Sequence, residues 1–305
     1  MRDLRINVGQ IGLQVWDNEQ EGEAIVFLHF SGANLMMWKR AVPAFQDAYR
    51  IVSIDLRGHG ASDMSPTGYA VDDMASDVLH VMGSLEIDCA HVIGSSLGAE
   101  VGLRLAATAP ERVISLVCEG APCSEYGPYS TWEDSEEAFE AHVAGQLEKM
   151  RSTPDTAFSS INALVDARQG ILQTYGWWNE DVEAMVRYGV RQNDHGTYAE
   201  SFGRHAMASY MDDLFHARFE DDYQRVTCPV LLALGEDDLE DPREKAAIEG
   251  LCGLAKRGKI VQVPGWMHPY GWMLNPEPMC DVILQFLAGA ELDQAGTDLR
   301  SKDSE

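Results

Sequence analysis

Ser96 is the residue of this sequence whose type and setting most clearly suggest chemistry. It is the central residue of a segment that reads GSSLG and fits the pattern G-x-S-x-G. The segment lies between an apolar run at residues 90–93, short enough for a buried strand, and a stretch over 97–109 with apolar residues at helical spacing. A serine at a sharp strand-to-helix turn exposes its hydroxyl, and the following helix directs free N–H groups at that oxygen. The pattern predicts a nucleophilic serine.

A serine hydroxyl needs a base to act as a nucleophile, because it holds its proton far above neutral pH. An imidazole can accept that proton, and a carboxylate can fix the imidazole tautomer and stabilise the charge that develops. His268 lies four residues beyond Pro264, and Asp238 lies three residues beyond Gly235, each just after a predicted strand. Because reactive groups gather at the carboxyl edge of an open parallel sheet, Ser96, Asp238 and His268 are predicted to meet there.

Strands and helices that could position these residues alternate along the chain. Alternating apolar residues at 4–8 and 13–16 predict an opening hairpin. Buried strands are predicted at 24–28, 51–54, 90–93, 113–117, 228–235 and 259–264. Helices are predicted within 35–48 and at 74–85, 97–109, 242–252 and 277–287. This order is typical of an α/β fold with a mostly parallel central sheet flanked by helices.

The alternation is interrupted after Pro122 by about a hundred residues rich in Tyr, Trp and Met. Four stretches there are predicted to be helical, with no clear buried strand between them: 138–150, 156–172, 179–190 and 201–219. The chain is therefore predicted to comprise a first part of the core at 1–122, a helical cap at 123–225, a second part of the core at 226–288, and a disordered polar tail at 289–305.

The balance of charges limits the partners of the chain. Its 305 residues include 49 acidic and 23 basic side chains, and the formal net charge is −26. Such a charge repels nucleic acid and anionic lipid, so neither is expected as a partner. No apolar run approaches the length of a membrane span, and the N-terminal residues show no apolar segment of an export signal.

The cysteines and the short motifs point away from metals and cofactors. The six cysteines include no C-x-x-C pair, which favours reduced thiols and a cytoplasmic protein. No H-E-x-x-H, EF-hand loop, Walker loop or G-x-G-x-x-G segment is present, so neither a metal nor a cofactor is predicted. The acidic runs at 133–137 and 220–222 are expected on the solvated surface.

Five segments together resemble the α/β-hydrolase superfamily, and the resemblance covers nearly the whole chain up to about residue 288. They are His29-Phe30-Ser31-Gly32 with Trp38, Asp55-x-Arg57-Gly58-His59-Gly60-x-Ser62, Gly94-x-Ser96-x-Gly98, Gly235-x-x-Asp238 and Pro264-Gly265-x-x-His268. The serine, the aspartate and the histidine follow one another in the family's order. The insertion after Pro122 falls where capped members carry a helical lid, so the resemblance implies an α/β-hydrolase fold with an inserted helical cap.

The resemblance implies a role for each residue of the predicted site. Ser96 would be the nucleophile, His268 the base, and Asp238 the acid that orients the base. The backbone N–H groups of Ser31 and Leu97 would form the oxyanion hole, each worth roughly 3 kcal/mol in the transition state.

Four side chains near these positions are candidates for the walls of the substrate pocket. Phe30 stands where the family's His-Gly-x loop usually has glycine, and it is expected to alter that loop and to wall the acyl pocket. Trp38 lies near the oxyanion loop in the sequence, and Trp266 and Met267 directly precede His268.

The sequence offers more than one carboxyl for the acid. Glu119 follows a strand whose end supplies the acid in some family members, and Glu236 and Asp237 adjoin Asp238. The spacing from Gly235 favours Asp238, with Glu119 as the main alternative.

The type of nucleophile narrows the reaction. A serine argues against the dehalogenase and epoxide-hydrolase branches of the family, whose alkyl intermediates form on a carboxylate. The resemblance implies a capped serine esterase or lactonase that cleaves a small, hydrophobic ester or lactone through an acyl-enzyme. The alternatives are a serine-dependent carbon–carbon bond hydrolase acting on a diketone-like substrate and a catalytically silent ligand-binding protein. The expected partner is a small molecule, and the sequence does not indicate an oligomeric state.

Overall fold

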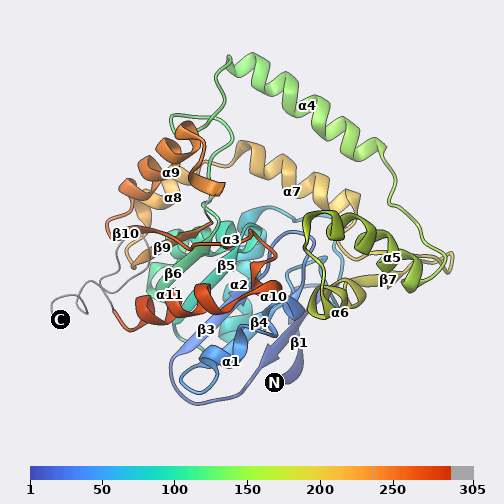
Figure 1. Ribbon diagram of the computed structural model, residues 1–305, viewed down its shortest axis with the longest axis horizontal. Helices are drawn as coiled ribbons and strands as arrows, with labels where there is room; N and C mark the ends of the chain where they lie inside the picture. The colour runs from blue at the N-terminus through green and yellow to red at the C-terminus, as the bar shows by residue number, and fades with distance from the viewer. Residues whose placement is uncertain (236, 290–305) are drawn as a thin grey trace.

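An eight-stranded sheet forms the centre of the protein in a computed structural model, which describes residues 1–235 and 237–289 (Figure 1). The strands lie in the order β1-β2-β4-β3-β5-β6-β9-β10, and all neighbours are parallel except β1–β2 and β2–β4. They are β1 (Arg2–Val8), β2 (Ile11–Asp17), β3 (Ala24–Leu28), β4 (Arg50–Ile54), β5 (Ala90–Ser95), β6 (Val113–Glu119), β9 (Val230–Leu234) and β10 (Gly258–Gln262). The mostly parallel sheet predicted from the sequence is confirmed.

Helices cover both faces of this sheet. One face packs against α1 (Val42–Phe45), α10 (Gly271–Leu274) and α11 (Glu277–Leu287). The opposite face packs against α2 (Val71–Ser84), α3 (Leu97–Thr108), α8 (Phe219–Arg225) and α9 (Pro242–Leu254). The predicted polar tail lies outside the described residues from residue 290 onward.

The central strands are buried on both faces, which explains their continuous apolar runs. Along β3, Val26 and Leu28 belong to the core on the α2–α3 side, whereas Ile25 and Phe27 belong to the core on the α10–α11 side. Successive side chains of a strand point to opposite faces, so the five residues of β3 contribute to the hydrophobic core on both faces of the sheet. Full burial of each such side chain contributes about 1.5–3 kcal/mol to folding.

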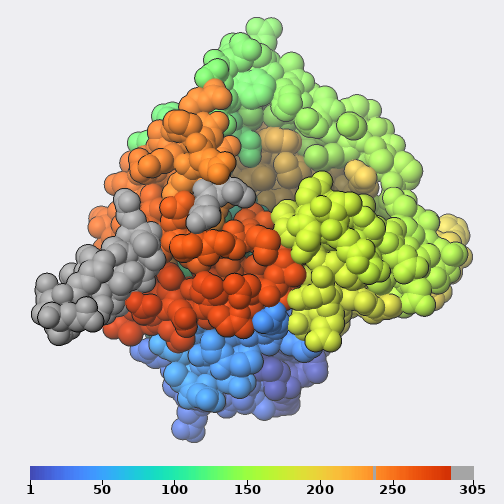
Figure 2. Space-filling view, viewed as in Figure 1, coloured from blue at the N-terminus to red at the C-terminus, as the bar shows by residue number. Residues whose placement is uncertain are grey.

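The segment between β6 and β9, which the sequence predicts to be a cap, contains helices and one short hairpin. Its elements before α8 are α4 (Glu136–Ser152), α5 (Ile161–Leu172), α6 (Glu180–Tyr188), β7 (Val190–Gln192), β8 (Tyr198–Glu200) and α7 (Arg204–His216). In Figure 1 the long helix α4 stands away from the sheet, and α7 runs between α4 and the core. The surface is hollowed between α4, α9 and the α5–α6 region (Figure 2).

Two parts of the cap differ from the sequence prediction. The hairpin β7–β8 begins at Val190, where the predicted helix was to end, and occupies a stretch with no predicted strand; its strands have three residues each, with only one of the six buried. Such short, half-exposed strands carry no apolar run that periodicity could detect. The helix predicted over 201–219 is found as α7, which ends at His216, and a separate helix that was not predicted, α8, begins at Phe219.

Candidate active site

Ser96 occupies a sharp turn between β5 and α3. Its backbone has φ 50° and ψ −117°, a conformation that costs a residue with a side chain of the order of 1–3 kcal/mol. A methyl group on Gly94 would lie 2.2 Å from the carbonyl oxygen of Gly98, and one on Gly98 would lie 2.1 Å from that of Leu28. Both glycines of the motif are therefore required by close backbone packing, as expected at a nucleophile elbow.

The ladder between β5 and β6 holds this turn next to a buried carboxyl. Ser95 and Glu119 are paired in register, and the backbone N–H of Ser96 donates to the carbonyl oxygen of Glu119 at 2.9 Å. Glu119 is the last residue of β6 and is fully buried. The nucleophile candidate and this carboxyl thus share one rung of the sheet.

His268 lies in the loop after β10 and is hydrogen-bonded to Glu119. Its Nδ1 is 2.5 Å from Oε1 of Glu119. The carboxyl that is hydrogen-bonded to His268 is therefore Glu119, the alternative acid of the sequence analysis, and not Asp238. The physical reason is the course of the loop after β10, which brings the imidazole of His268 to the end of β6 rather than to Asp238 after the neighbouring strand β9.

Three further donors surround the carboxyl of Glu119. The indole N–H groups of Trp266 and Trp272 donate to it at 2.8 Å and 3.1 Å, and the hydroxyl of Ser95 donates at 2.5 Å. Burial by itself raises the pKa of Glu119, but the charge of His268 and these hydrogen bonds outweigh burial and lower it below its usual value. Glu119 is therefore held as a carboxylate that faces the imidazole.

Asp238 lies at the same site, and its carboxylate binds the backbone at the end of β9. It is half-buried on the 3-10 turn after β9, and its Oδ2 accepts the backbone N–H of Gly235 at 2.7 Å. It lines the cavity that also contains Ser96 and His268. The structure thus brings the predicted aspartate to the site, while the bond to His268 Nδ1 that the sequence assigned to it is made by Glu119. Glu236, another carboxyl considered for this role, lies outside the described residues.

The two carboxylates set the protonation of His268. Burial lowers its pKa, but the charge and the hydrogen bond of Glu119, together with the charge of Asp238, raise it above the usual value of 6.5 overall. A half-buried imidazole with an ionised partner on Nδ1 keeps its proton there and presents Nε2 for proton transfer.

We expect the acid limb of kcat/KM for a nitrophenyl ester to have an apparent pKa above 6.5. His268 must be neutral to accept a proton, and its pKa is raised, so activity increases with pH through that higher value. The measurement is kcat/KM between about pH 5 and about pH 9. Asp238→Asn removes one of the charges that raise the pKa, so its midpoint should move to lower pH. A wild-type midpoint at or below 6.5 would contradict the assignment.

The loop that follows β3 fits the predicted oxyanion donors. Within the described residues, the backbone N–H groups of Ser31 and Leu97 donate to no backbone carbonyl. The left-handed residue of the loop is Gly32, with φ 80°, and the N–H of Ala33 closes the turn onto the carbonyl of Phe30 at 3.0 Å. A glycine is thus not required at position 30, which explains how the loop accommodates Phe30.

The described residues that line the cavity at Ser96 include none of the four that were predicted as pocket walls. Trp38 is fully buried between Phe27 and Trp272, with ring centroids 4.8 Å and 4.6 Å away, and is a core residue. Trp266 is buried and acts on Glu119 instead. Phe30 packs 5.5 Å from the ring of Tyr270, and Met267 is exposed.

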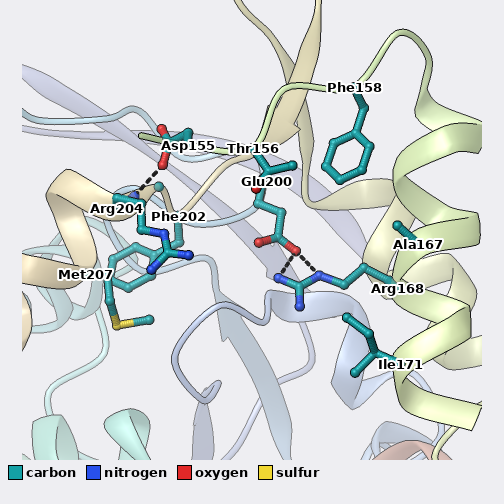
Figure 3. Close-up of a pocket in the computed structure, with 11 residues that line it drawn as sticks. Asp155, Thr156, Phe158, Ala167, Arg168, Ile171, Glu200, Phe202, Arg204 and Met207 are labelled. Carbon is teal, nitrogen blue, oxygen red and sulfur yellow. Dashed lines mark hydrogen bonds and ion pairs between the residues drawn. The ribbon is translucent and has the colours of Figure 1, made fainter. Parts of the chain in front are cut away.

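Two cavities flank the site. One, of about 340 Å³, contains Ser96 and His268 and extends along residues 120–125 to α9. The other, of about 510 Å³, lies in the cap between α5, β8 and the start of α7 (Figure 3). Met207 on its wall places its sulfur 3.8 Å from the hydroxyl of Ser31, so the cap cavity adjoins the oxyanion loop.

The cap cavity has apolar walls and ionic groups. Phe158, Ile171 and Phe202 supply apolar surface, and Arg168 forms an ion pair with Glu200, as Figure 3 shows. Apolar walls with a few placed polar groups are typical of small-molecule sites. The sequence analysis identified neither these residues nor Ser95 and Trp272 as part of the site, and it assigned Trp266 to a pocket wall rather than to Glu119.

The described residues contain neither a metal site nor a membrane span. No group of three or more His, Cys, Asp and Glu side chains among them could hold a metal ion. None of their helices is both long enough and apolar enough to cross a bilayer.

Comparison with known proteins identifies the family. The sequence matches the family described as alpha/beta hydrolase fold over residues 23–265. It is 31% identical over 292 residues to a 2-(acetamidomethylene)succinate hydrolase of Mesorhizobium japonicum, covering 93% of this chain and 94% of that one. A 3-oxoadipate enol-lactonase of Acinetobacter baylyi is 30% identical over 132 residues, 43% of this chain, and the chain spans about half of that relative, 47%.

A solved structure agrees with the sequence matches. That of E-2-(acetamidomethylene)succinate hydrolase superposes with a TM-score of 0.73 at 26% identity, covering 94% of this chain and 99% of that one. The chain therefore belongs to the α/β-hydrolase fold family. The two relatives described above are named as a hydrolase and a lactonase, and the chain is an enzyme of the α/β-hydrolase family.

Proposed function

We propose that the protein is a serine hydrolase that cleaves a small carboxylic ester or lactone through an acyl-enzyme. Ser96 is the nucleophile, His268 the base and Glu119 the orienting acid. The N–H groups of Ser31 and Leu97 receive the oxyanion. The observation that carries the proposal is the hydrogen bond between His268 and buried Glu119 at the edge of the cavity that Ser96 lines.

The reaction proceeds in two halves that use the same groups. The Ser96 oxygen attacks the carbonyl carbon while its proton passes to Nε2 of His268, and the negative charge moves to the carbonyl oxygen in the oxyanion hole. Collapse of this intermediate expels the alcohol, which takes the proton from Nε2. Water then attacks the acyl-enzyme with the same proton transfers and releases the acid and free Ser96.

Glu119 rather than Asp238 serves as the acid in this proposal. A carboxylate must lie within hydrogen-bond distance of Nδ1 to fix the tautomer, and Glu119 does so at 2.5 Å. Asp238 acts on His268 through its charge and holds the end of β9 through the N–H of Gly235.

The cap cavity is assigned to the acyl part of the substrate. It adjoins the oxyanion loop through Met207, and its walls include Phe158, Ile171 and Phe202. A lactonase among the relatives supports an ester or lactone substrate. The division into a core and a cap over 123–225 and a cytoplasmic location stay predictions from the sequence.

A fluorophosphonate and a nitrophenyl ester test the proposal directly. The phosphonate should label Ser96, located by mass spectrometry of the peptides, and prior labelling should abolish hydrolysis of nitrophenyl butyrate. Carbon–carbon bond cleavage uses the same groups, and a marked preference for a vinylogous diketone over the ester would favour that reaction. Failure to label Ser96 would refute the assignment of the nucleophile.

A further inference from the structure

The cavity that contains Ser96 and His268 is lined by carboxylic acids. Of the fifteen residues that line it, four are acidic: Glu100, Glu125, Asp238 and Glu244. Among these described lining residues, His268 is the only Lys, Arg or His. Walls of one charge sign focus the electric field within a cavity, so the charge of a substrate group placed there affects its binding strongly.

Glu100 is the most deeply buried of these acids. It lies one helical turn after Ser96 on α3 and is 9% exposed. Its Oε2 accepts the hydroxyl of Tyr210, on cap helix α7, at 2.7 Å, and no other side chain in the described part of the chain bonds it. Burial raises the pKa of Glu100 to about 7. A buried carboxyl with an unpaired oxygen at a cavity wall is stabilised by a positive neighbour.

The other acids surround the same space from different elements. Glu125 lies in the segment that leads to the cap, and Glu244 lies in the first turn of α9. Neither forms an ion pair with a described Lys or Arg. All four acids act on the thiol of Cys123, which is on the cavity wall. Burial is the largest cause that raises the pKa of this thiol to about 12, and the charges of the four acids add to it.

This cavity lies on the side of the leaving group. His268, which protonates the departing alcohol in the proposed reaction, is on its wall, whereas the described residues that line it do not include Ser31. The cap cavity instead adjoins the oxyanion loop, where Met207 on its wall contacts Ser31. The two parts of an ester therefore meet different surroundings, with the acidic walls around the alcohol part.

On the basis of the proposed serine hydrolase activity, we infer that the preferred substrates are esters whose alcohol part carries a cationic ammonium or guanidinium group. Glu125 and Glu244 attract the cation, and Glu100 lies beneath it. A carboxylate on the same part of the substrate is repelled by Glu125, Asp238 and Glu244. The acidic walls thus determine specificity at the leaving-group side of the site.

The test compares two esters that differ in charge and hardly in shape. Butyrylcholine carries a trimethylammonium group, and neohexyl butyrate carries a tert-butyl group in its place. At low ionic strength we expect kcat/KM to be at least about ten-fold higher for the choline ester, equivalent to about 1.4 kcal/mol. Added salt should reduce this ratio, because it screens the acidic walls.

Charge-neutralising variants locate the effect in the cavity. Glu244→Gln and Glu125→Gln should each reduce the ratio of choline ester to neohexyl ester about three-fold or more. Glu244 is exposed, so its replacement should not disturb folding. Glu148→Gln, on the exposed surface of α4, removes the same charge outside the cavity and should leave the ratio unchanged.

The remaining outcomes separate this inference from the proposed function. Equal kcat/KM for the two esters, or a ratio unaffected by both cavity variants, would overturn the cationic substrate class. Hydrolysis of nitrophenyl butyrate with no turnover of either test ester would also overturn it. Loss of nitrophenyl butyrate hydrolysis together with failure of Ser96 to react with phosphonate would instead refute the serine hydrolase itself.

Discussion

Ser96→Ala is expected to reduce kcat for a nitrophenyl ester by about 10⁴- to 10⁶-fold. The variant lacks the oxygen that attacks the carbonyl, and the neighbouring hydroxyl of Ser95 cannot replace it because it is buried and donates to Glu119. Folding should be unaffected, since alanine bears a Cβ like serine and retains the backbone bond to Glu119 at 2.9 Å. The measurements are steady-state kinetics and thermal unfolding of the purified variant.

A serine elsewhere provides the control for this variant. Ser84→Ala removes an exposed hydroxyl at the end of α2, outside the described walls of both cavities at the site, and should retain the activity of the parent enzyme. If Ser96→Ala kept more than about a thousandth of the activity, nucleophilic catalysis by this residue would be refuted.

Glu119→Gln is expected to lower kcat by about 10⁴-fold, whereas Asp238→Asn should lose less than about ten-fold. A glutamine at 119 can present its amide nitrogen to Nδ1, which selects the wrong imidazole tautomer. It also removes the charge that stabilises the imidazolium in the transition state. Asp238 acts on His268 through its charge, so Asp238→Asn changes the pKa of His268 while keeping an oxygen that can accept the N–H of Gly235. The reverse order of effects would assign the acid to Asp238.

Folding must be measured alongside this pair of variants. The carboxyl of Glu119 accepts from Trp266, Trp272 and Ser95 as well as from His268. A glutamine leaves at least one of these buried donors without an acceptor, which costs about 1–3 kcal/mol of stability. Activities should therefore be compared well below the unfolding transition, with circular dichroism confirming the folded state of each variant.

The sequence predicted the core because its elements are buried in regular patterns. The run at 24–28 coincides with β3, and the apolar spacing over 277–287 coincides with α11. The two glycines around Ser96 predicted the elbow, and the structure places them where no Cβ fits. In each case one local feature, an apolar period or a steric requirement, determines the local structure.

The choice of acid could not be made from the sequence, because it depends on contacts distant along the chain. Glu119 and Asp238 both follow strands that end at one edge of the sheet. Only the course of the loop after β10 decides which carboxyl faces Nδ1 of His268. Trp272, which supports Glu119, lies beyond this loop on α10, and nothing in its local pattern distinguishes it from an ordinary core tryptophan.

The cap was predicted less well than the core because its segments are short and partly solvated. The hairpin β7–β8 has two strands of three residues, too short for a period-two pattern. Trp38, predicted as a pocket wall from its place near the oxyanion loop, packs into the core because its ring fills the space between β3 and α10. Nearness along the chain did not determine which cavity a side chain reaches.

The pairing of β5 with β6 determines which of the three catalytic groups can leave its position first. Ser96 and Glu119 are tied together by the backbone and cannot separate without breaking the sheet. His268 is carried by a loop with no such restraint, so any reversible disassembly of the three groups must begin there. Mild denaturant should accordingly abolish turnover before the sheet melts, with the imidazole the first of the three to leave its position.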